Sequence, residues 1–146
     1  IKTNNEQKLR MVRKLKTLIG GDFEKKTIAI LGLAFKPNTD DVRESASIEM
    51  IKNIIEEGGL VNAFDPVAND SMRIIFPDIF YKNSWEEACK DADAVVIMTE
   101  WNEFRGISLS YLKSLMKRPI LLDTRNILNV KKLSRNKFLF DNVGHS

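Results

Sequence analysis

Cysteine and histidine are nearly absent from this sequence, whose 146 residues contain only Cys89 and His145. One cysteine excludes an intrachain disulfide framework, and so few thiol and imidazole groups exclude a zinc cage built from several of them. Acidic neighbours of Cys89 would raise its thiol pKa, so we interpret this cysteine as a packing residue rather than a nucleophile. We interpret His145 as a solvated tail residue, and we expect no metal site and a reducing, cytoplasmic setting.

Long apolar runs and an excess of one charge are absent as well. No apolar run approaches the roughly 20 residues that a membrane-spanning helix needs, and the start lacks the apolar core of a signal peptide. The 23 basic and 20 acidic residues leave a net charge of +3, far from the concentrated basic excess that favours nucleic-acid binding. The sequence thus predicts a soluble protein that binds neither membranes nor nucleic acid.

The apolar residues, 43% of the chain, alternate between strand-like and helical patterns. The clearest strand is the continuous apolar run 27–34, and the next helix has an apolar stripe of Ile48, Ile51, Ile54 and Ile55. A loop is expected around Trp101 and Phe104; the other strands are expected at 60–64, 80–81, 92–98, 119–122 and 138–142, and the other helices at 9–19, 68–75, 109–116, 130–133 and around Cys89. This alternation predicts an α/β fold: a Rossmann-like, doubly wound parallel sheet with helices on both faces, preceded by an N-terminal helix.

Ligands of an open parallel sheet bind at the carboxyl ends of its strands. Lys36 and Arg43 follow the first predicted strand and Arg125 follows the fifth, so we expect these three cations to meet at one edge of the sheet. The corresponding positions after the second and fourth strands hold Asp65 and Glu100.

The glycine-rich turn of a dinucleotide-binding site is missing. Its fingerprint needs three glycines that let backbone N–H groups approach a pyrophosphate, and only Gly32 is present, followed by bulky residues. The pattern favours a phosphate site made by side chains, in which the Lys36 ammonium acts as a point charge. We therefore expect a nucleoside diphosphate as ligand, rather than NAD bound through its pyrophosphate.

Each of the three cations also has a simpler interpretation. Lys36 is equally well explained as a solvated loop lysine. Arg43 would oppose the dipole of the second helix at a cost of about 0.3–1 kcal/mol, unless a structural ion pair neutralises it with Asp40, Asp41 or Glu44. Arg125 could bind a phosphate or a base edge through its guanidinium fork, or form a salt bridge to Asp123.

Four segments closely resemble the C-terminal domain of the UDP-glucose/GDP-mannose dehydrogenase family. They are GLAFKPNTDDVRES at 32–45, Phe64-Asp65-Pro66, ADAVVIMTEWNEFR at 92–105 and DTRNI at 123–127. The resemblance spans residues 26–144, and its motifs are long and specific. It implies an enzyme that oxidises the sugar C6 hydroxyl of a nucleotide sugar to a carboxylate in two steps, each of which reduces one NAD.

The resemblance also implies roles for single residues. Phe35 and Lys36 match positions that contact the bound nucleotide sugar, Arg125 matches a substrate-contacting arginine, and Arg43 matches a residue that reaches NAD across the domain cleft. Cys89 matches no catalytic position. The glycine fingerprint and the catalytic cysteine belong to the N-terminal and central domains of the family, so we expect this chain alone to be inactive.

The organisation implied by the resemblance is a helix followed by one domain. Residues 1–21 correspond to the tail of a central inter-domain helix, around which the family's homodimers are built, and residues 22–146 to the nucleotide-sugar-binding domain. Because the chain opens on Ile1 within a polar helical pattern, we expect it to be a piece of a longer polypeptide.

Several alternatives stay open. The motifs resemble the UDP-glucose branch most, but Thr124 stands where that branch often has glycine, so GDP-mannose and UDP-N-acetyl-hexosamine remain candidate substrates. A non-enzymatic nucleotide-binding module is a further candidate. A signalling receiver domain has the same alternation but needs acidic residues after its first strand, where this sequence has Phe35 and Lys36.

Overall fold

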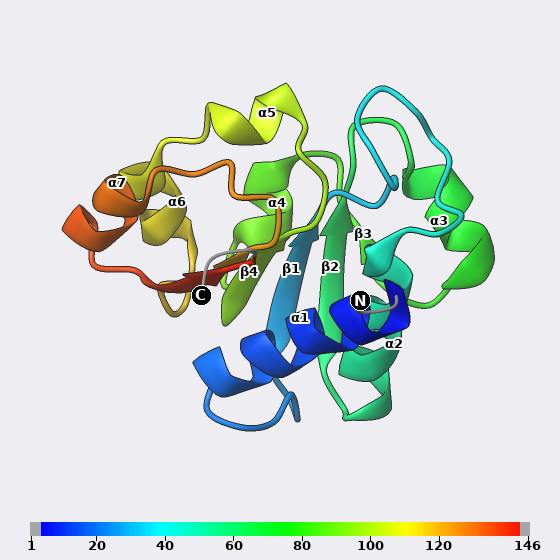
Figure 1. The fold of residues 1–146 in the computed structure, drawn as a ribbon, viewed down its shortest axis with the longest axis horizontal. Coiled ribbons are helices and arrows are strands. Elements are labelled where there is room, and N and C mark those ends of the chain that lie inside the picture. The colour runs from blue at the N-terminus through cyan, green and yellow to red at the C-terminus, as the bar shows by residue number, and fades with distance from the viewer. Residues whose placement is uncertain (1–3, 144–146) are drawn as a thin grey trace.

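The computed structural model of the protein describes residues 4–143, so His145 lies outside the described residues. One sheet of six strands forms its centre, in the order β3-β2-β1-β4-β5-β6, and every neighbouring pair is parallel. The strands are β1 (Thr27–Leu31), β2 (Leu60–Phe64), β3 (Phe80–Tyr81), β4 (Ala94–Ile97), β5 (Ile120–Asp123) and β6 (Leu139–Asn142). The first strand, β1, lies in the middle of the sheet. The chain adds β2 and β3 on one side of it and then β4, β5 and β6 on the other, which confirms the predicted doubly wound sheet (Figure 1).

Seven helices are described, and they cover both faces of the sheet. The hydrophobic core on one face includes residues from α1 (Asn4–Leu18), α2 (Ala46–Glu56) and α3 (Asn69–Ile75). The core on the other face includes residues from α4 (Trp85–Cys89), α5 (Asn102–Arg105), α6 (Leu109–Leu115) and α7 (Val130–Arg135). The predicted N-terminal helix is therefore α1, which buries Val12 and Leu15 against the sheet.

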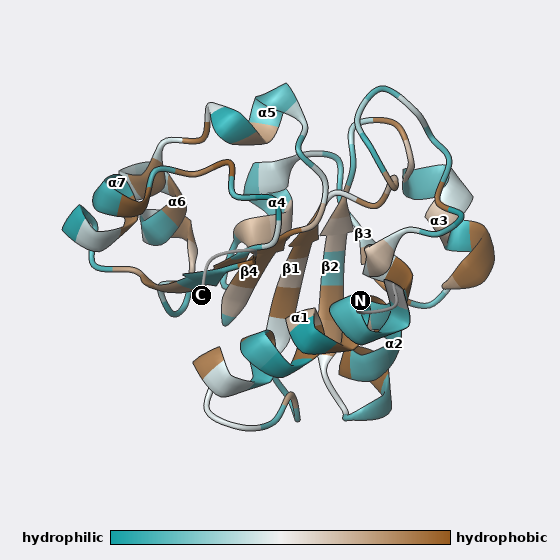
Figure 2. Ribbon diagram, in the orientation of Figure 1, coloured by the Kyte–Doolittle hydropathy of each residue, from teal (hydrophilic) through white to brown (hydrophobic). Residues whose placement is uncertain are grey.

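Alternation along each central strand supplies both cores. Ile28 and Ile30 of β1 belong to the α1 and α2 side, whereas Ala29 and Leu31 belong to the α4 and α6 side, because successive side chains of a strand point to opposite faces. All four are fully buried. This is why the run is continuously apolar in sequence and why Figure 2 shows the middle of the sheet mostly in hydrophobic colours.

Three sequence predictions need correction. The first strand ends at Leu31 and not at 34, because Gly32 turns the chain with a φ of 102°. The expected loop around Phe104 contains the short helix α5, and Phe104 is buried in the core. Ile55, which the sequence places in the apolar stripe of α2, is 40% exposed, because its position on the helix turns its side chain away from the sheet. No helix within residues 4–143 is long and apolar enough to cross a membrane.

Candidate functional site

The ends of β1 and β4 approach each other unusually closely at the point where the strand order reverses. A Cβ atom added to Gly32 would lie 2.5 Å from the Cβ of Thr99, so only glycine fits this approach. The Thr99 hydroxyl donates to the Ala34 carbonyl at 2.6 Å, and the Ser47 hydroxyl donates to the Gly32 carbonyl at 2.8 Å. These bonds fix the turn after β1 to the start of α2 and to the end of β4.

A buried carboxylate occupies the centre of this turn. Asp65 follows β2 and is 2% exposed. Its two oxygens accept N–H groups at 2.7 to 3.1 Å from the backbone of Leu33, Ala34, Val67 and Ala68 and from the indole of Trp101. In a dinucleotide-binding domain the N–H groups of this turn face a pyrophosphate. Here those of Leu33 and Ala34 are bonded to an internal anion, so this turn does not fit the pyrophosphate of NAD.

Beside this turn lies a cavity of about 360 Å³, which we call the edge cavity. It is bounded by α1, by the turn after β1 and the start of α2, and by the residues that follow β4 and β5. Its lining residues are Gln7, Lys8, Met11, Ala34, Phe35, Glu44, Ser45, Ala46, Met98 and Arg125. Phe35 is 42% exposed, and the cations of the lining are Lys8 and Arg125. The structure thus brings together two of the predicted site residues, Phe35 and Arg125.

Arg125 is held by two carboxylates that come from neighbouring strands. Its backbone N–H donates to Asp123 Oδ1 at 3.1 Å, and Asp123 Oδ2 accepts the backbone N–H of Leu128 at 2.8 Å. Its guanidinium Nη2 donates to Glu100 Oε2 at 2.7 Å. Arg125 therefore does form a salt bridge, but its partner is Glu100 and not Asp123, which the sequence suggested. The Asp123 carboxylate already accepts two backbone N–H groups.

The charge on Glu100 is maintained by this contact. Burial raises the pKa of Glu100, but the hydrogen bond from Arg125, the backbone N–H of Glu100 itself and the charges of Arg125 and Arg105 outweigh it and leave the pKa below its ordinary value. The second carboxylate oxygen, Oε1, is buried and has no hydrogen-bond partner among the described residues. Arg125 is thus the side chain that hydrogen-bonds the Glu100 carboxylate among the described residues.

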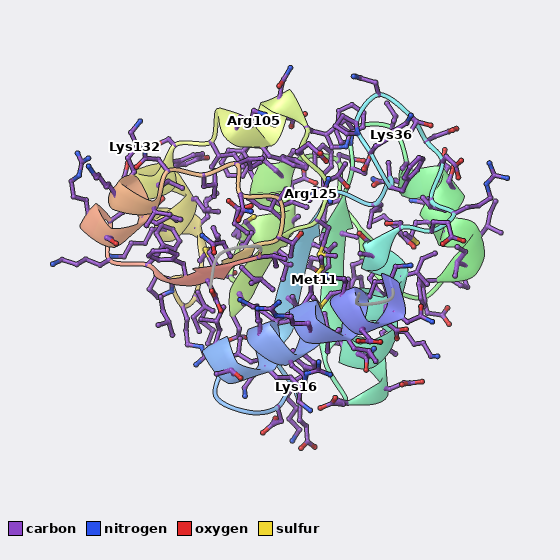
Figure 3. The ribbon with its side chains drawn as sticks, in the orientation of Figure 1. Met11, Lys16, Lys36, Arg105, Arg125 and Lys132 are labelled. Atoms are coloured by element: carbon purple, nitrogen blue, oxygen red, sulfur yellow. The ribbon has the colours of Figure 1, made fainter. Side chains whose placement is uncertain are left out.

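Lys36 lies next to the edge cavity but is not part of its lining. Its Nζ is 5.4 Å from the centroid of the Phe35 ring, a distance at which the ring face attracts a cation. In Figure 3 Lys36 lies on the loop beyond the end of β1. Lys36 thus contacts a residue of the cavity lining, Phe35, without lining the cavity itself.

Arg43 does not line the edge cavity. Its guanidinium donates to both oxygens of Asp41, at 3.0 and 2.8 Å, and its side chain is 87% exposed. It lines a different hollow together with Thr39 and Ser71. The three cations follow the carboxyl ends of parallel strands, as predicted, but they do not share one hollow: Arg125 lines the edge cavity, Lys36 does not, and Arg43 lines another. Among the acids considered from the sequence, Asp41 is the one that neutralises Arg43.

Cys89 has the packing role that the sequence predicts. It is a free, fully buried cysteine in the core between α4 and the sheet. Burial raises the pKa of its thiol strongly, and the charge of Glu86 adds to this. A thiol of this kind is not a nucleophile, because the reactive form is the thiolate.

Sequence reasoning missed the contribution of α1 to the cavity. Gln7, Lys8 and Met11 lie 23 to 28 residues before Ala34 and Phe35 of the same lining, and on an amphipathic helix they resemble ordinary surface positions. Asp65 and Glu100 were identifiable, because each follows directly on a strand. Their hydrogen-bond partners could not be identified from the sequence.

The fold and the edge cavity define a Rossmann-like α/β domain with its ligand-sized hollow at the carboxyl ends of β1, β4 and β5. Residues 29–130 match the UDP-glucose/GDP-mannose dehydrogenase family, UDP binding domain. This match covers more than half of the chain, which therefore belongs to that family.

Its relatives are consistent with this placement. The chain is 40% identical to the UDP-glucose 6-dehydrogenase of Rickettsia bellii (strain RML369-C), over 99% of this chain and 34% of the relative. It is 38% identical to that of Rhizobium meliloti (strain 1021), over 99% of this chain and 33% of the relative. A solved UDP-glucose dehydrogenase from the archaeon Pyrobaculum islandicum superposes with a TM-score of 0.81 at 29% identity, covering 98% of this chain and 31% of that one. The chain thus spans about a third of the length of these relatives.

Proposed function

We propose that this chain is the nucleotide-sugar-binding C-terminal domain of an NAD-dependent UDP-glucose 6-dehydrogenase, which oxidises UDP-glucose to UDP-glucuronate in two steps. The supporting observation is that Phe35 and Arg125, from segments 90 residues apart, line one cavity at the carboxyl edge of the sheet. The relatives that share 38–40% of the sequence are UDP-glucose 6-dehydrogenases.

The edge cavity offers groups that suit a nucleoside diphosphate. The Arg125 guanidinium can donate two parallel hydrogen bonds to a phosphate or to a base edge. The exposed Phe35 ring offers a face on which a flat group can stack. Lys36, which contacts the Phe35 ring, supplies a mobile positive charge. We assign these three residues to UDP-sugar binding.

NAD is assigned mainly to an N-terminal domain that this chain does not contain. Arg43 is the residue that we propose to reach the cofactor from this side, which would require its pair with Asp41 to open or to share the guanidinium. Cys89 is too buried to serve as the catalytic cysteine. We therefore propose that residues 22–146 bind the nucleotide sugar and are inactive without the N-terminal and central domains, and that the enzyme works in the cytoplasm.

Residues 1–21 are proposed to be the tail of the central helix through which two subunits pair.

Calorimetric titration of this chain with UDP, GDP and NAD tests the proposal. UDP should bind weakly, and both Arg125→Ala and Lys36→Ala should reduce its affinity. Arg73→Ala is the control, because Arg73 is a partly exposed cation on α3 that pairs with Asp70 and lies outside the edge cavity. Tight NAD binding, or UDP binding that neither variant weakens, would contradict the assignment. Tighter binding of GDP than of UDP would favour a GDP-mannose dehydrogenase.

A further inference from the structure

The contacts of Thr124 and Asp123 fix the backbone of Arg125, but they do not hold its guanidinium. Thr124 extends the β4–β5 pairing by one residue, through its N–H and its hydroxyl on the Ile97 carbonyl at 3.1 and 2.6 Å. Asp123 then holds the Arg125 N–H. A long arginine side chain still has several rotatable bonds beyond this point, and ordering them costs binding free energy.

Glu100 is the group that restrains the rest of this side chain. It lies three residues past the end of β4, and Arg125 lies two residues past the end of the neighbouring β5, so the adjacent strand ends bring the two residues near each other. The 2.7 Å bond to Glu100 is the only hydrogen bond that the guanidinium makes to the described residues. Because a guanidinium has five N–H donors, the remaining ones stay available for a ligand in the edge cavity.

We propose that Glu100 is a positioning residue, which holds the Arg125 guanidinium in the orientation that receives the nucleotide diphosphate. This inference rests on the proposed function, and it assigns a role to a residue that lies outside the lining of the cavity. Both side chains are partly shielded from water, at 38% and 27% exposure, so their pairing is stronger than that of two freely solvated side chains.

A competing role for Glu100 makes the opposite prediction. If its carboxylate acts only as a negative charge near an anionic ligand, removing the charge raises UDP affinity. If it positions Arg125, removing the contact lowers UDP affinity. Glu100→Gln and Glu100→Ala are both neutral, but the glutamine keeps an oxygen that can accept from Nη2 and the alanine does not. Comparing these two variants therefore isolates the contact from the charge.

The experiment is calorimetric UDP titration of the chain and of Glu100→Gln, Glu100→Ala, Arg125→Ala and the double variant Arg125→Ala/Glu100→Ala. Glu100→Ala should bind UDP about fivefold more weakly than Glu100→Gln, the cost of leaving one long side chain unrestrained. In the Arg125→Ala background the change at Glu100 should have no effect. Glu103→Ala, which removes an exposed carboxylate three residues on, should leave the affinity unchanged.

The outcomes separate this inference from the function on which it rests. Equal UDP affinity for Glu100→Gln and Glu100→Ala, or tighter binding by Glu100→Ala than by the unaltered chain, overturns the positioning role and leaves the proposed function standing. Absence of UDP binding by the unaltered chain, or UDP binding that Arg125→Ala leaves unchanged, overturns both. Thermal unfolding of each variant verifies that the titrated protein is folded.

Discussion

Asp65 accepts the backbone N–H of Leu33 at 2.7 Å, across the gap between the end of β2 and the turn after β1. The donor belongs to the turn that binds pyrophosphate in dinucleotide-binding domains, and the acceptor is an anion supplied by the protein itself. The same carboxylate also accepts from Ala34 and from the Trp101 indole. The segments that surround the edge cavity are thus tied together from inside the fold.

Removing the charge of Asp65 should destabilise the protein. In Asp65→Asn one of the two acceptor oxygens becomes an NH₂ group, which faces backbone donors and leaves them unsatisfied, at a cost of about 2–4 kcal/mol. Urea unfolding followed by circular dichroism measures this. Asp70→Asn is the matched control, since that carboxylate is 95% exposed, and its effect should stay within about 0.5 kcal/mol. Similar unfolding midpoints for the two variants would contradict the structural role of Asp65.

Gly32→Ala should lower the free energy of unfolding by more than backbone strain alone would. Gly32 and Gly20 have nearly the same positive φ, 102° and 101°, so alanine at either position pays the left-handed penalty of about 1–2 kcal/mol. Only at Gly32 does the new Cβ collide with Thr99, at 2.5 Å, whereas nothing lies within 4 Å at Gly20. We expect Gly32→Ala to lose about 2 kcal/mol more than Gly20→Ala. Equal losses in urea unfolding would mean that β1 and β4 are farther apart than described.

The pair of Asp41 and Arg43 should be visible in an acid titration. The side-chain hydrogen bond from Arg43, with smaller contributions from its backbone N–H and its charge, lowers the pKa of Asp41 to about 2 from an ordinary 3.8. Since the pKa in the folded state is depressed, the pair stabilises the fold above pH 3.8, and this stabilisation is lost as the pH falls through about 2.

In Arg43→Ala the pKa of the Asp41 carboxyl, followed by NMR, should return toward 3.8. Lys36→Ala is the control, because the charge of Lys36 is the smallest cause of the shift. An Asp41 that titrates at the same pH with and without Arg43 would show that the two are not paired in solution.

Cys89 should react with a thiol reagent only after the protein unfolds. The side chain is fully buried, and burial raises the pKa of the thiol, so both access and thiolate formation are suppressed. Labelling by a chromogenic disulfide in native buffer is the measurement, with the urea-unfolded chain as positive control. Rapid labelling of the native chain would be inconsistent with the packing described for α4.

Phe35→Ala should weaken UDP binding about fivefold or more, since stacking of a base on an aromatic ring is worth about 1–3 kcal/mol. Phe80→Ala is a control of the same chemistry, because Phe80 is 54% exposed on β3, outside the edge cavity. Titration of both variants with UDP is the measurement. Equal affinities would remove Phe35 from the site.

The sequence predicts the fold far better than it predicts the side-chain pairs. A buried parallel strand such as β1 is apolar on both faces, which leaves a continuous local pattern. That the strands run parallel follows from the helices that alternate with them, because parallel neighbours need crossover connections. These features depend on residues that are close in sequence, so even the weak segment at Phe80 and Tyr81 forms the expected strand.

The site needed information that no local pattern holds. Arg125 has Asp123 two residues away, yet its guanidinium pairs with Glu100, 25 residues away. The choice depends on which carboxylate has already been occupied by backbone N–H groups, and that is decided by the conformation of the turn up to Leu128. Arg43 is the opposite case, because its partner Asp41 is two residues away and was among the acids considered from the sequence.

The first helix, α1, contributes Gln7, Lys8 and Met11 to the wall of the edge cavity. It is also attached to the edge strand β6 by Lys14, which donates to the Asn142 carbonyl at 2.8 Å. Because this helix forms part of the wall, we expect a molecule that fills the cavity to stabilise the seating of the helix. The seated helix should raise the affinity for that molecule by the same coupling free energy. The helix thus joins the wall of the edge cavity to the edge strand β6.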